Sequence, residues 1–508
     1  MKKIILIALL TLLTASLHAQ ISSAEIDEVA KRALTTFNVP GIAIAVVKDG
    51  KVIHSKGYGV RSVVTKQPVN ENTLFGIASN SKAFTASAIA MLVDEGKMDW
   101  DDKVVKYIPD FQMYNEYVTN EFTVRDLLTH RSGLGLGAGD LMIWPGGSDF
   151  TPKDIIHNLR YLKPVSAFRT KFDYDNLLYM VAGEIITKVS GKSWTDFVEE
   201  RIMQPLQMTS SAGTYVTLKD TSNIVMPHVP VDQKLKVISR YKDRTLDAAG
   251  GIYSSVADVS KWMIMQLNKG QYGASQQQLF SKKQHAEMWQ MQTILPVTTR
   301  PPYNTHFSGY ALGWFVADVK GQLQVSHTGG LEGMVTQVTL LPEMNLGIVV
   351  LTNQQSGAAF SAITNTIKDS YLGITAQDYV AMYGEREKAG GTSADKITDE
   401  VWATVTKNLK TTKPNPKLVG TYNDPWLGEV NITEKKGKMF FASKRSPQLT
   451  GELFHYKDNN YVVKWNNRAL HADAHIFFDE SFTTFTMKPI SPLTDFSYDF
   501  QDLSFTRK

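Results

Sequence analysis

The segment FGIASNSKAFTASAIAMLVDEG, Phe75 to Gly96, places a serine and a lysine three residues apart at the start of a long apolar run. Residues i and i+3 lie on one face of a helix, so a helix that begins at Ser79 would direct the Lys82 amine at the Ser79 hydroxyl. A serine hydroxyl is a weak nucleophile that needs a neighbouring base, and a lysine can serve when burial or another cation lowers its pKa. The alternative is a helix-capping serine beside a solvated lysine, because S-x-x-K also occurs by chance.

A tyrosine and an asparagine two residues apart form a second candidate motif, Tyr174-Asp175-Asn176, in the segment KFDYDNLLYMVAG. A tyrosine hydroxyl held near a lysine could carry a proton, and an asparagine could hydrogen-bond a substrate amide. The alternative is a packed loop tyrosine followed by an asparagine helix cap.

A third candidate motif is His327-Thr328-Gly329-Gly330, in the segment QVSHTGGLEGM. A strand that ends in small or polar residues lets a substrate backbone lie along its edge. The alternative is a plain turn between two strands.

Together and in this order, the three motifs resemble those of the serine β-lactamase and penicillin-binding-protein superfamily. The tyrosine in the second motif is most similar to the class C β-lactamase branch, with its esterases, D-aminopeptidases and DD-peptidases. The supporting segments are PGIAIAVVKDGKVIHSKGYG, LLTHRSGLG, AAGGIYSSVADVSKWM and GYALGWFV. The resemblance extends from about Ser22 to Leu372.

This resemblance implies an acyl-enzyme mechanism. Ser79 would attack a carbonyl, and water would hydrolyse the acyl-enzyme. Lys82 and Tyr174 would share the general-base and general-acid roles, and the residues leave open which of them takes the proton. Asn176 would orient the substrate amide, and the backbone N–H groups of Ser79 and Gly330 would form the oxyanion hole.

The third motif departs from that of β-lactamases, which usually carry a lysine where this chain has His327. A lysine there can bind a substrate carboxylate, whereas a histidine is mostly neutral near pH 7. A histidine is common in relatives that are esterases or D-amino-acid peptidases. We therefore expect hydrolysis of a peptide (D-amino-acid or peptidoglycan-type) or an ester. The alternatives are a β-lactamase and a catalytically silent protein that binds peptidoglycan fragments.

The order of the predicted elements indicates an α/β (α+β) fold. Two β-rich runs flank Asp49-Gly50 in Gly41 to Gly59, a strong hairpin signal. A mostly helical pattern follows from Ser79 to about Val189, and strands return between Ala311 and Thr352. A closing helical pattern ends near Leu372. We expect a β-lactamase-like sandwich of an antiparallel sheet and a helical region, followed by a small antiparallel β-barrel domain.

The chain is too long for one hydrophobic core, so we expect more than one domain. The predicted division is a signal peptide at 1–19, a serine hydrolase domain at 20–383, a linker with a short helix at 384–412 and a β-domain at 413–508. The last segment, from KPNPKLVGTY onward, resembles the small lipocalin-like β-domain appended to several such hydrolases. It could cap the active site, or it could be a stabilising or dimer-forming module.

The N-terminus and the composition indicate where the protein works. Lys2 and Lys3, the apolar run Ile4 to Leu13, and Leu17-His18-Ala19 are typical of a signal peptide, which predicts a periplasmic or secreted protein. The chain has no cysteine and a formal charge of +4 without a basic block. We therefore expect no disulfide, no nucleic-acid partner and no membrane span in the mature chain.

Two further motifs are weak. Gly133 to Gly139, GLGLGAG, lacks the spacing and the Lys-Ser/Thr ending of a phosphate loop. The alternation His471-Ala472-Asp473-Ala474-His475 would place three possible ligands on one strand face, but an exposed strand commonly alternates in this way. We therefore expect no metal and no cofactor. The candidate substrate is a small molecule, a peptide or an ester.

Overall fold

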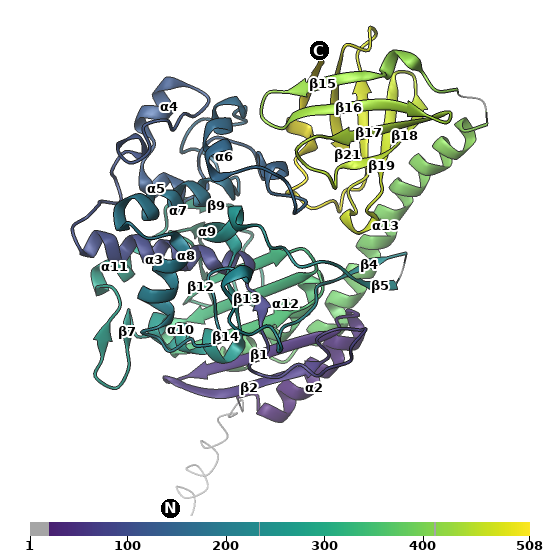
Figure 1. The fold of residues 1–508 in the computed structure, drawn as a ribbon. Helices are drawn as coiled ribbons and strands as arrows, with labels where there is room; N and C mark the ends of the chain where they lie inside the picture. Colours follow the sequence, from purple (N-terminus) through teal and green to yellow (C-terminus); the bar gives the residue numbers. More distant parts are fainter. Residues whose placement is uncertain (1–19, 233, 411–412) are drawn as a thin grey trace, which may run out of the picture.

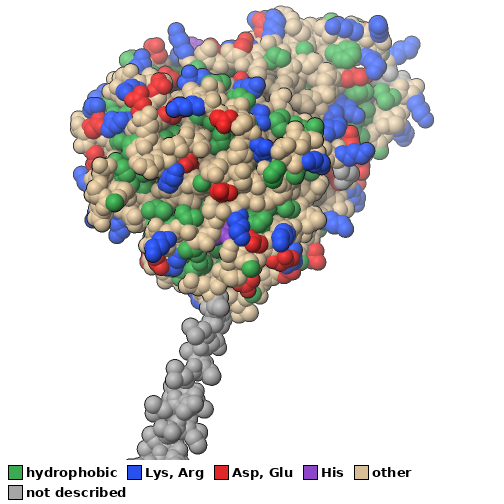
Figure 2. All heavy atoms as spheres, turned by 60° about the horizontal axis from the view of Figure 1, so that its bottom comes forward, with side chains coloured by type: hydrophobic (Ala, Val, Ile, Leu, Met, Phe, Trp, Pro, Cys, Tyr) green, Lys and Arg blue, Asp and Glu red, His purple; other side chains and the backbone are tan. Residues whose placement is uncertain are grey.

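A computed structural model describes residues 20–232, 234–410 and 413–508 (Figure 1). The predicted signal peptide, residues 1–19, lies outside the described residues. Every helix within these ranges is too short or too polar to span a bilayer. Basic and acidic side chains are interspersed over the face of the molecule in Figure 2.

Two segments far apart in the sequence meet in the main sheet. Strand β1 (Gly41–Lys48) pairs antiparallel with β2 (Lys51–Gly59) on one side and with β14 (Leu346–Thr352) on the other. Asp49 and Gly50 have φ values of 51° and 73°, as a two-residue hairpin turn of type I′ requires. The predicted hairpin is confirmed.

The main sheet has eight strands in the order β2-β1-β14-β13-β12-β11-β10-β9. The other five strands are β9 (Thr293–Leu295), β10 (Ser308–Tyr310), β11 (Phe315–Val319), β12 (Gln322–Leu331) and β13 (Met334–Leu341). All neighbours are antiparallel, so the predicted antiparallel sheet is confirmed. Strands β9 and β10, which the sequence analysis did not predict, extend it at one edge.

Each face of the sheet has its own hydrophobic layer, because successive side chains of a strand point to opposite faces. One face of β1 carries Ile42, Ile44 and Val46, which pack with α2 (Ser23–Thr36) and α12 (Gly357–Tyr371). The other face carries Ala43, Ala45 and Val47, which belong to the hydrophobic layer shared with the helical region.

The helical region lies on the second face of the sheet and provides the elements around the candidate site (Figure 1). Its α-helices are α3 (Ser81–Asp94), α4 (Glu116–Glu121), α5 (Val124–Leu127), α6 (Pro152–Asn158), α7 (Leu177–Ser190), α8 (Trp194–Val198), α9 (Asp247–Gly250), α10 (Val256–Leu267) and α11 (Lys282–Trp289). Short strand pairs accompany them: β3 (Phe75–Gly76) with β6 (Tyr253–Ser254), β4 (His228–Val231) with β5 (Lys234–Val237), and β7 (Gln271–Tyr272) with β8 (Gln277–Gln278).

The segment 384–412 differs from its prediction as a linker with a short helix. Residues Tyr379–Asn408 form one continuous helix of 30 residues, α13, which runs from the α12 layer to the last domain (Figure 1). The polar segment with Gly390-Gly391 predicts a break, but the two ends of the helix are anchored by packing. Tyr379 packs with α2 and α12, and Val401 packs on the barrel. Tertiary packing therefore overrides the weak local propensity.

The C-terminal part is a closed antiparallel barrel of eight strands, as predicted. The strands are β15 (Gly420–Asp424), β16 (Gly428–Lys435), β17 (Lys438–Ser443), β18 (Thr450–Lys457), β19 (Asn460–Trp465), β20 (Ala474–Phe478), β21 (Thr484–Pro489) and β22 (Ser504–Arg507). Buried aromatic rings, including Tyr422, Phe441 and Phe485, fill its interior. The fold class is thus the predicted α/β sandwich followed by a small β-barrel.

Candidate active site

Ser79 lies in a 3₁₀ turn, η1 (Ala78–Asn80), that leads directly into α3. The α-helix therefore begins two residues later than predicted, but residues i and i+3 also align in a 3₁₀ turn. Ala78 has φ 50°, a conformation that residues with side chains rarely adopt. Asn80 Nδ2 donates to Ile77 O at 3.1 Å and to Thr336 Oγ1 at 2.8 Å, so side-chain bonds hold this turn against β13.

Lys82 is completely buried, and its amine has three polar neighbours. Nζ lies 3.0 Å from Ser79 Oγ, 2.7 Å from Asn176 Oδ1 and 2.9 Å from Ala249 O. Burial lowers the pKa of Lys82 to about 7, and the more distant carboxyl groups of Asp140 and Asp175 oppose this shift only in part. A large fraction of Lys82 is therefore an unprotonated amine near neutral pH.

The Tyr174 ring covers the lysine. Lys82 Nζ lies 4.8 Å from its centroid, and the phenol hydrogen-bonds the Ser79 side chain. Burial raises the pKa of Tyr174 well above its usual range. The ring is packed against His130, with centroids 4.1 Å apart. The phenol is therefore neutral at physiological pH.

Asn176 is the N-cap residue of α7, but its side chain makes no capping bond, and the Leu177 N–H donates to Asp175 Oδ1 at 3.0 Å instead. The Asn176 amide is free to face the lysine. Its Nδ2 donates to Asp140 Oδ2 at 2.8 Å. This bond fixes the orientation of the amide and leaves Oδ1 for Lys82.

The third motif lies on β12, which passes beside Ser79. His327 and Gly329 are buried, whereas Thr328 and Gly330 are exposed and line the same cavity as Ser79. A Cβ at Gly329 would lie 2.3 Å from Ile77 O, so only glycine lets the strand approach the Ser79 turn this closely. The structure therefore brings together all the residues that the three motifs predict.

His327 is an uncharged member of the site. Burial lowers its pKa to about 3, and the charge of Lys82 acts in the same direction. Its Nε2 shares a hydrogen bond of 2.9 Å with the Tyr310 hydroxyl. The position that carries a lysine in β-lactamases therefore carries no positive charge here.

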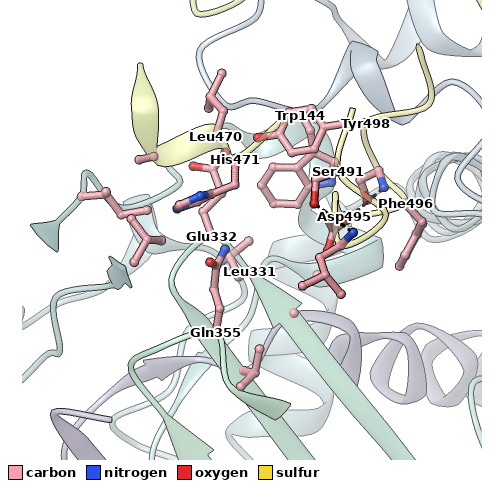
Figure 3. Close-up of a pocket in the computed structure, with 18 of the residues that line it drawn as sticks. Trp144, Leu331, Glu332, Gln355, Leu470, His471, Ser491, Asp495, Phe496 and Tyr498 are labelled. Carbon is pink, nitrogen blue, oxygen red and sulfur yellow. Dashed lines mark hydrogen bonds between the residues drawn. The ribbon is translucent and has the colours of Figure 1, made fainter. Parts of the chain in front are cut away.

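The cavity that contains Ser79 has a volume of about 1120 Å³ and is lined by both parts of the chain. The barrel contributes residues of two segments, 467–471 and 490–498, and Figure 3 shows His471, Asp495, Phe496 and Tyr498 beside Trp144 and Glu332 of the first part. Phe496 also contacts the Tyr174 ring, with centroids 5.9 Å apart. The barrel thus covers the cavity, one of the two arrangements that the sequence analysis considered.

Some residues of the site were missed by sequence reasoning. Asp140 follows the Gly133 to Gly139 segment, and Ser497 belongs to the barrel, so only the folded chain brings them to Asn176. Tyr310 lies in GYALGWFV, a segment that marks the resemblance without indicating a role. His130 has a structural contact instead, because its Nδ1 accepts the Asp175 N–H at 3.1 Å.

The His471 to His475 segment does not form a metal site. Asp473 is paired with Arg468 at 2.6 Å, and His471 lines the cavity. Across the described ranges, no group of three or more His, Asp or Glu side chains is placed to hold a metal ion. The reactive groups that meet at Ser79 are an amine, a phenol and an amide.

The antiparallel sheet lies between helices on both of its faces, and a serine and a buried lysine stand together at the start of one of these helices. The family model described as Beta-lactamase matches residues 26–372, so this chain belongs to the beta-lactamase family. A second model, described as a domain of unknown function (DUF3471), matches residues 406–507, the barrel and the end of α13.

Similar proteins include enzymes named as hydrolases. The chain is 28% identical over 454 residues to unguisins hydrolase ungD' of Aspergillus campestris, which covers 84% of this chain and 80% of that protein. It is 29% identical over 355 residues to protein flp of Staphylococcus aureus, which covers 66% of this chain and 64% of that protein. The solved structure of an octameric penicillin-binding protein homologue from Pyrococcus abyssi matches 96% of this chain and all of that chain, with a TM-score of 0.63 and 22% identity. This last match shows the same fold.

Proposed function

We propose that this protein is an exported serine hydrolase that forms an acyl-enzyme on Ser79 and hydrolyses a peptide bond, of the D-amino-acid or peptidoglycan type, or an ester bond. One observation carries the proposal. The buried amine of Lys82, with its pKa lowered to about 7, lies 3.0 Å from the Ser79 hydroxyl. A binding protein would not require a lysine buried at this cost.

The contacts of Lys82 favour it as the base. An unprotonated amine has two N–H bonds and one lone pair. Asn176 Oδ1 and Ala249 O are acceptors only, so they take the two N–H bonds. The lone pair is left for the third neighbour, the Ser79 hydroxyl, which donates its proton to Nζ as Oγ bonds to the substrate carbonyl carbon.

Tyr174 suits the opposite step. Its raised pKa makes it a poor base but keeps its proton available at neutral pH. When the tetrahedral intermediate collapses, the bond to the leaving group breaks. The leaving amine or alcohol takes the proton of the Tyr174 hydroxyl. The Lys82 ammonium then gives its extra proton to Tyr174 and becomes a neutral amine again. A water molecule then adds to the acyl-enzyme by the same route in reverse and restores Ser79.

The backbone supplies the oxyanion site in this mechanism. The N–H groups of Ser79 and Gly330 would receive the negative charge that develops on the carbonyl oxygen. Asn176 would contact the substrate amide, and Thr328 on the exposed face of β12 would bind the substrate backbone.

The β-lactamase alternative is less well supported. A β-lactam carries a carboxylate, and the neutral His327 offers it no positive charge. The relative named as a hydrolase of unguisins is consistent with a hydrolase that acts on other substrates. We therefore favour peptidase or esterase activity.

The test is labelling of the purified protein with a fluorescent fluorophosphonate, in parallel with Ser79→Ala. Labelling is expected in the wild type and absent from Ser79→Ala, with an unchanged circular dichroism spectrum. Ser87→Ala is the matched control, because Ser87 is a buried serine of α3, the helix that follows the Ser79 turn, and its hydroxyl donates to Met288 Sδ. It should keep the labelling. A wild type that no acylating probe labels, fluorescent penicillin included, would favour the silent binding protein instead.

Export is a separate part of the proposal, since it depends on residues 1–19. N-terminal sequencing of protein recovered from the periplasm or the medium should begin near Gln20. Recovery in the cytoplasm with Met1 retained would contradict it.

A further inference from the structure

Glu332 occupies a constrained position on the cavity wall. It stands in the two-residue turn between β12 and β13, two residues after Gly330. The second residue of the turn, Gly333, has φ 71°, and a Cβ there would lie 2.7 Å from the backbone N of His228. The turn is therefore held against the segment before β4. Figure 3 shows Glu332 among the residues that line the cavity.

The Glu332 carboxyl group is incompletely satisfied. Oε1 is buried and has no hydrogen-bond partner, while the carboxyl group receives a bond from the Gly146 N–H. The charged groups that act on it are Asp243 and Asp495, both acidic. Burial, followed by these two carboxylates, raises the pKa of Glu332 to about 7, although the Gly146 bond opposes the shift. An isolated buried carboxylate is costly, so a positive charge beside it would be strongly favoured.

Aromatic side chains line the same cavity as this carboxyl group, among them Trp144 and Tyr498 (Figure 3). Burial raises the pKa values of Tyr241 and Tyr498, and the nearby charge of Glu332 acts on both in the same direction. The Trp144 ring contacts Tyr241, with centroids 4.8 Å apart. Ring faces attract cations, so rings beside a carboxylate suit an ammonium group in particular.

The other charged residues that line the cavity also favour a positively charged substrate group over a negatively charged one. The acidic lining residues of the cavity include Glu332 and Asp495. Arg468 also lines it, but Asp473 neutralises this guanidinium by pairing at 2.6 Å. A substrate anion would therefore find no unpaired cation among the described lining residues, whereas a substrate cation would find several carboxylates.

We propose that Glu332, in the cavity that the Trp144 and Tyr498 rings also line, binds an ammonium group of the substrate, so that the preferred acyl substrate carries a free amine such as a peptide N-terminus. This inference rests on the proposed function, because it names the substrate class of the same site. The Glu332 carboxylate would then recognise a substrate group of positive charge, whereas the lysine of β-lactamases can bind a substrate carboxylate.

Binding is tested in a Ser79→Ala background, where the probes are not hydrolysed. The probe is alaninamide, as both enantiomers, and its N-acetyl derivative, which lacks the positive charge. Isothermal titration calorimetry at pH 7 should show binding of at least one alaninamide enantiomer at least tenfold tighter than its N-acetyl form. Adding Glu332→Gln should reduce this preference at least tenfold.

Asp395→Asn is the matched control. Asp395 lines the same cavity from α13 but is exposed, so its charge is screened by solvent. The Asp395→Asn variant should change the preference for alaninamide over its N-acetyl derivative less than twofold. Equal binding of the two probes, or a preference that Glu332→Gln leaves unchanged, overturns the inference. Fluorophosphonate labelling of the single variant Glu332→Gln reports on the fold and on Ser79 separately. Failure of the subsite is thereby distinguished from failure of the hydrolase proposal.

Discussion

Ser497 Oγ donates a hydrogen bond of 2.8 Å to Asp140 Oδ2, although the two residues are 357 positions apart in the chain. The same carboxylate oxygen accepts a bond of 2.8 Å from Asn176 Nδ2. Asn176 Oδ1 in turn contacts the Lys82 amine. The barrel is therefore joined by three consecutive hydrogen bonds to the lysine that we propose as the base.

Removing the Ser497 hydroxyl should weaken this connection. Ser497→Ala leaves Asp140 with one fewer donor in a buried position, a loss of about 1 kcal/mol. We expect a several-fold lower kcat with little change in KM, because Asn176 would hold Lys82 less firmly. Steady-state kinetics with a neutral ester measure both constants. Ser497→Thr, which keeps the hydroxyl, should restore kcat.

Ser491→Ala is the control for that experiment. Ser491 belongs to the same barrel segment, but its hydroxyl accepts a local bond from the Leu493 N–H at 3.2 Å instead of reaching Asp140. Its kinetics should match those of the wild type. An equal effect of the two alanine variants would mean that the segment, and not the Asp140 contact, determines the rate.

The pH dependence of acylation should follow Lys82. Because burial lowers its pKa to about 7, the amine is protonated and inactive below that pH and free above it. The acylation rate should therefore rise with pH and level off above about pH 8. His327 should add no second step between pH 5 and 8, since its pKa is about 3. Stopped-flow labelling across this range tests both statements, and a rate that falls as pH rises through 7 would contradict the assignment.

The same shift predicts an effect on stability. The folded protein holds Lys82 neutral above about pH 7, whereas an unfolded chain keeps a lysine charged up to about pH 10.4. Its burial therefore lowers the free energy of unfolding fully below pH 7 and progressively less as pH rises from there. Lys82→Met removes this pH-dependent cost along with the activity. The difference in Tm, variant minus wild type, should be more positive at pH 6 than at pH 9 in thermal denaturation. A difference that is constant with pH would show that Lys82 is not buried as a titrating group.

The close approach of the barrel to the first domain can be tested at a glycine. Gly137 has φ 71°, and a Cβ there would lie 2.6 Å from the backbone O of Phe496. Gly191 has φ 72° with nothing within 4 Å of its Cβ position. Both alanine variants carry the same backbone strain of about 1 kcal/mol, but only Gly137→Ala should displace the barrel segment. We expect it to lower kcat and to reduce Tm more than Gly191→Ala does. Equal losses of stability, with unchanged activity, would contradict a tight contact.

Features of the fold and the site that are set by residues close together in the chain could be predicted from the sequence. Features that depend on contacts between distant parts of the chain could not. The Ser79–Lys82 pair is local, since one helical turn sets its geometry, and its prediction needed no tertiary information. The Asp140–Ser497 contact depends on how the barrel docks, which no local pattern encodes. Glu332 follows the third motif directly, yet its burial beside aromatic rings arises only when the β4 segment and the barrel pack against its turn. The prediction for the α13 segment was wrong for the opposite reason. Local signals predicted a break in the helix, but packing at both of its ends keeps the helix continuous.

Gly390 and Gly391 in α13 provide a last test. Both lie in the helix interior with open space around the Cβ positions, and neither has a positive φ. Each glycine costs a helix about 1 kcal/mol relative to alanine. The double variant Gly390→Ala, Gly391→Ala should therefore raise Tm by several degrees, since the helix joins the α12 layer to the barrel. Differential scanning calorimetry measures this, with Gly273→Ala as a control in which a positive φ of 69° predicts a loss instead. A Tm that falls in the double variant would show that residues 390–391 do not form a continuous helix in solution.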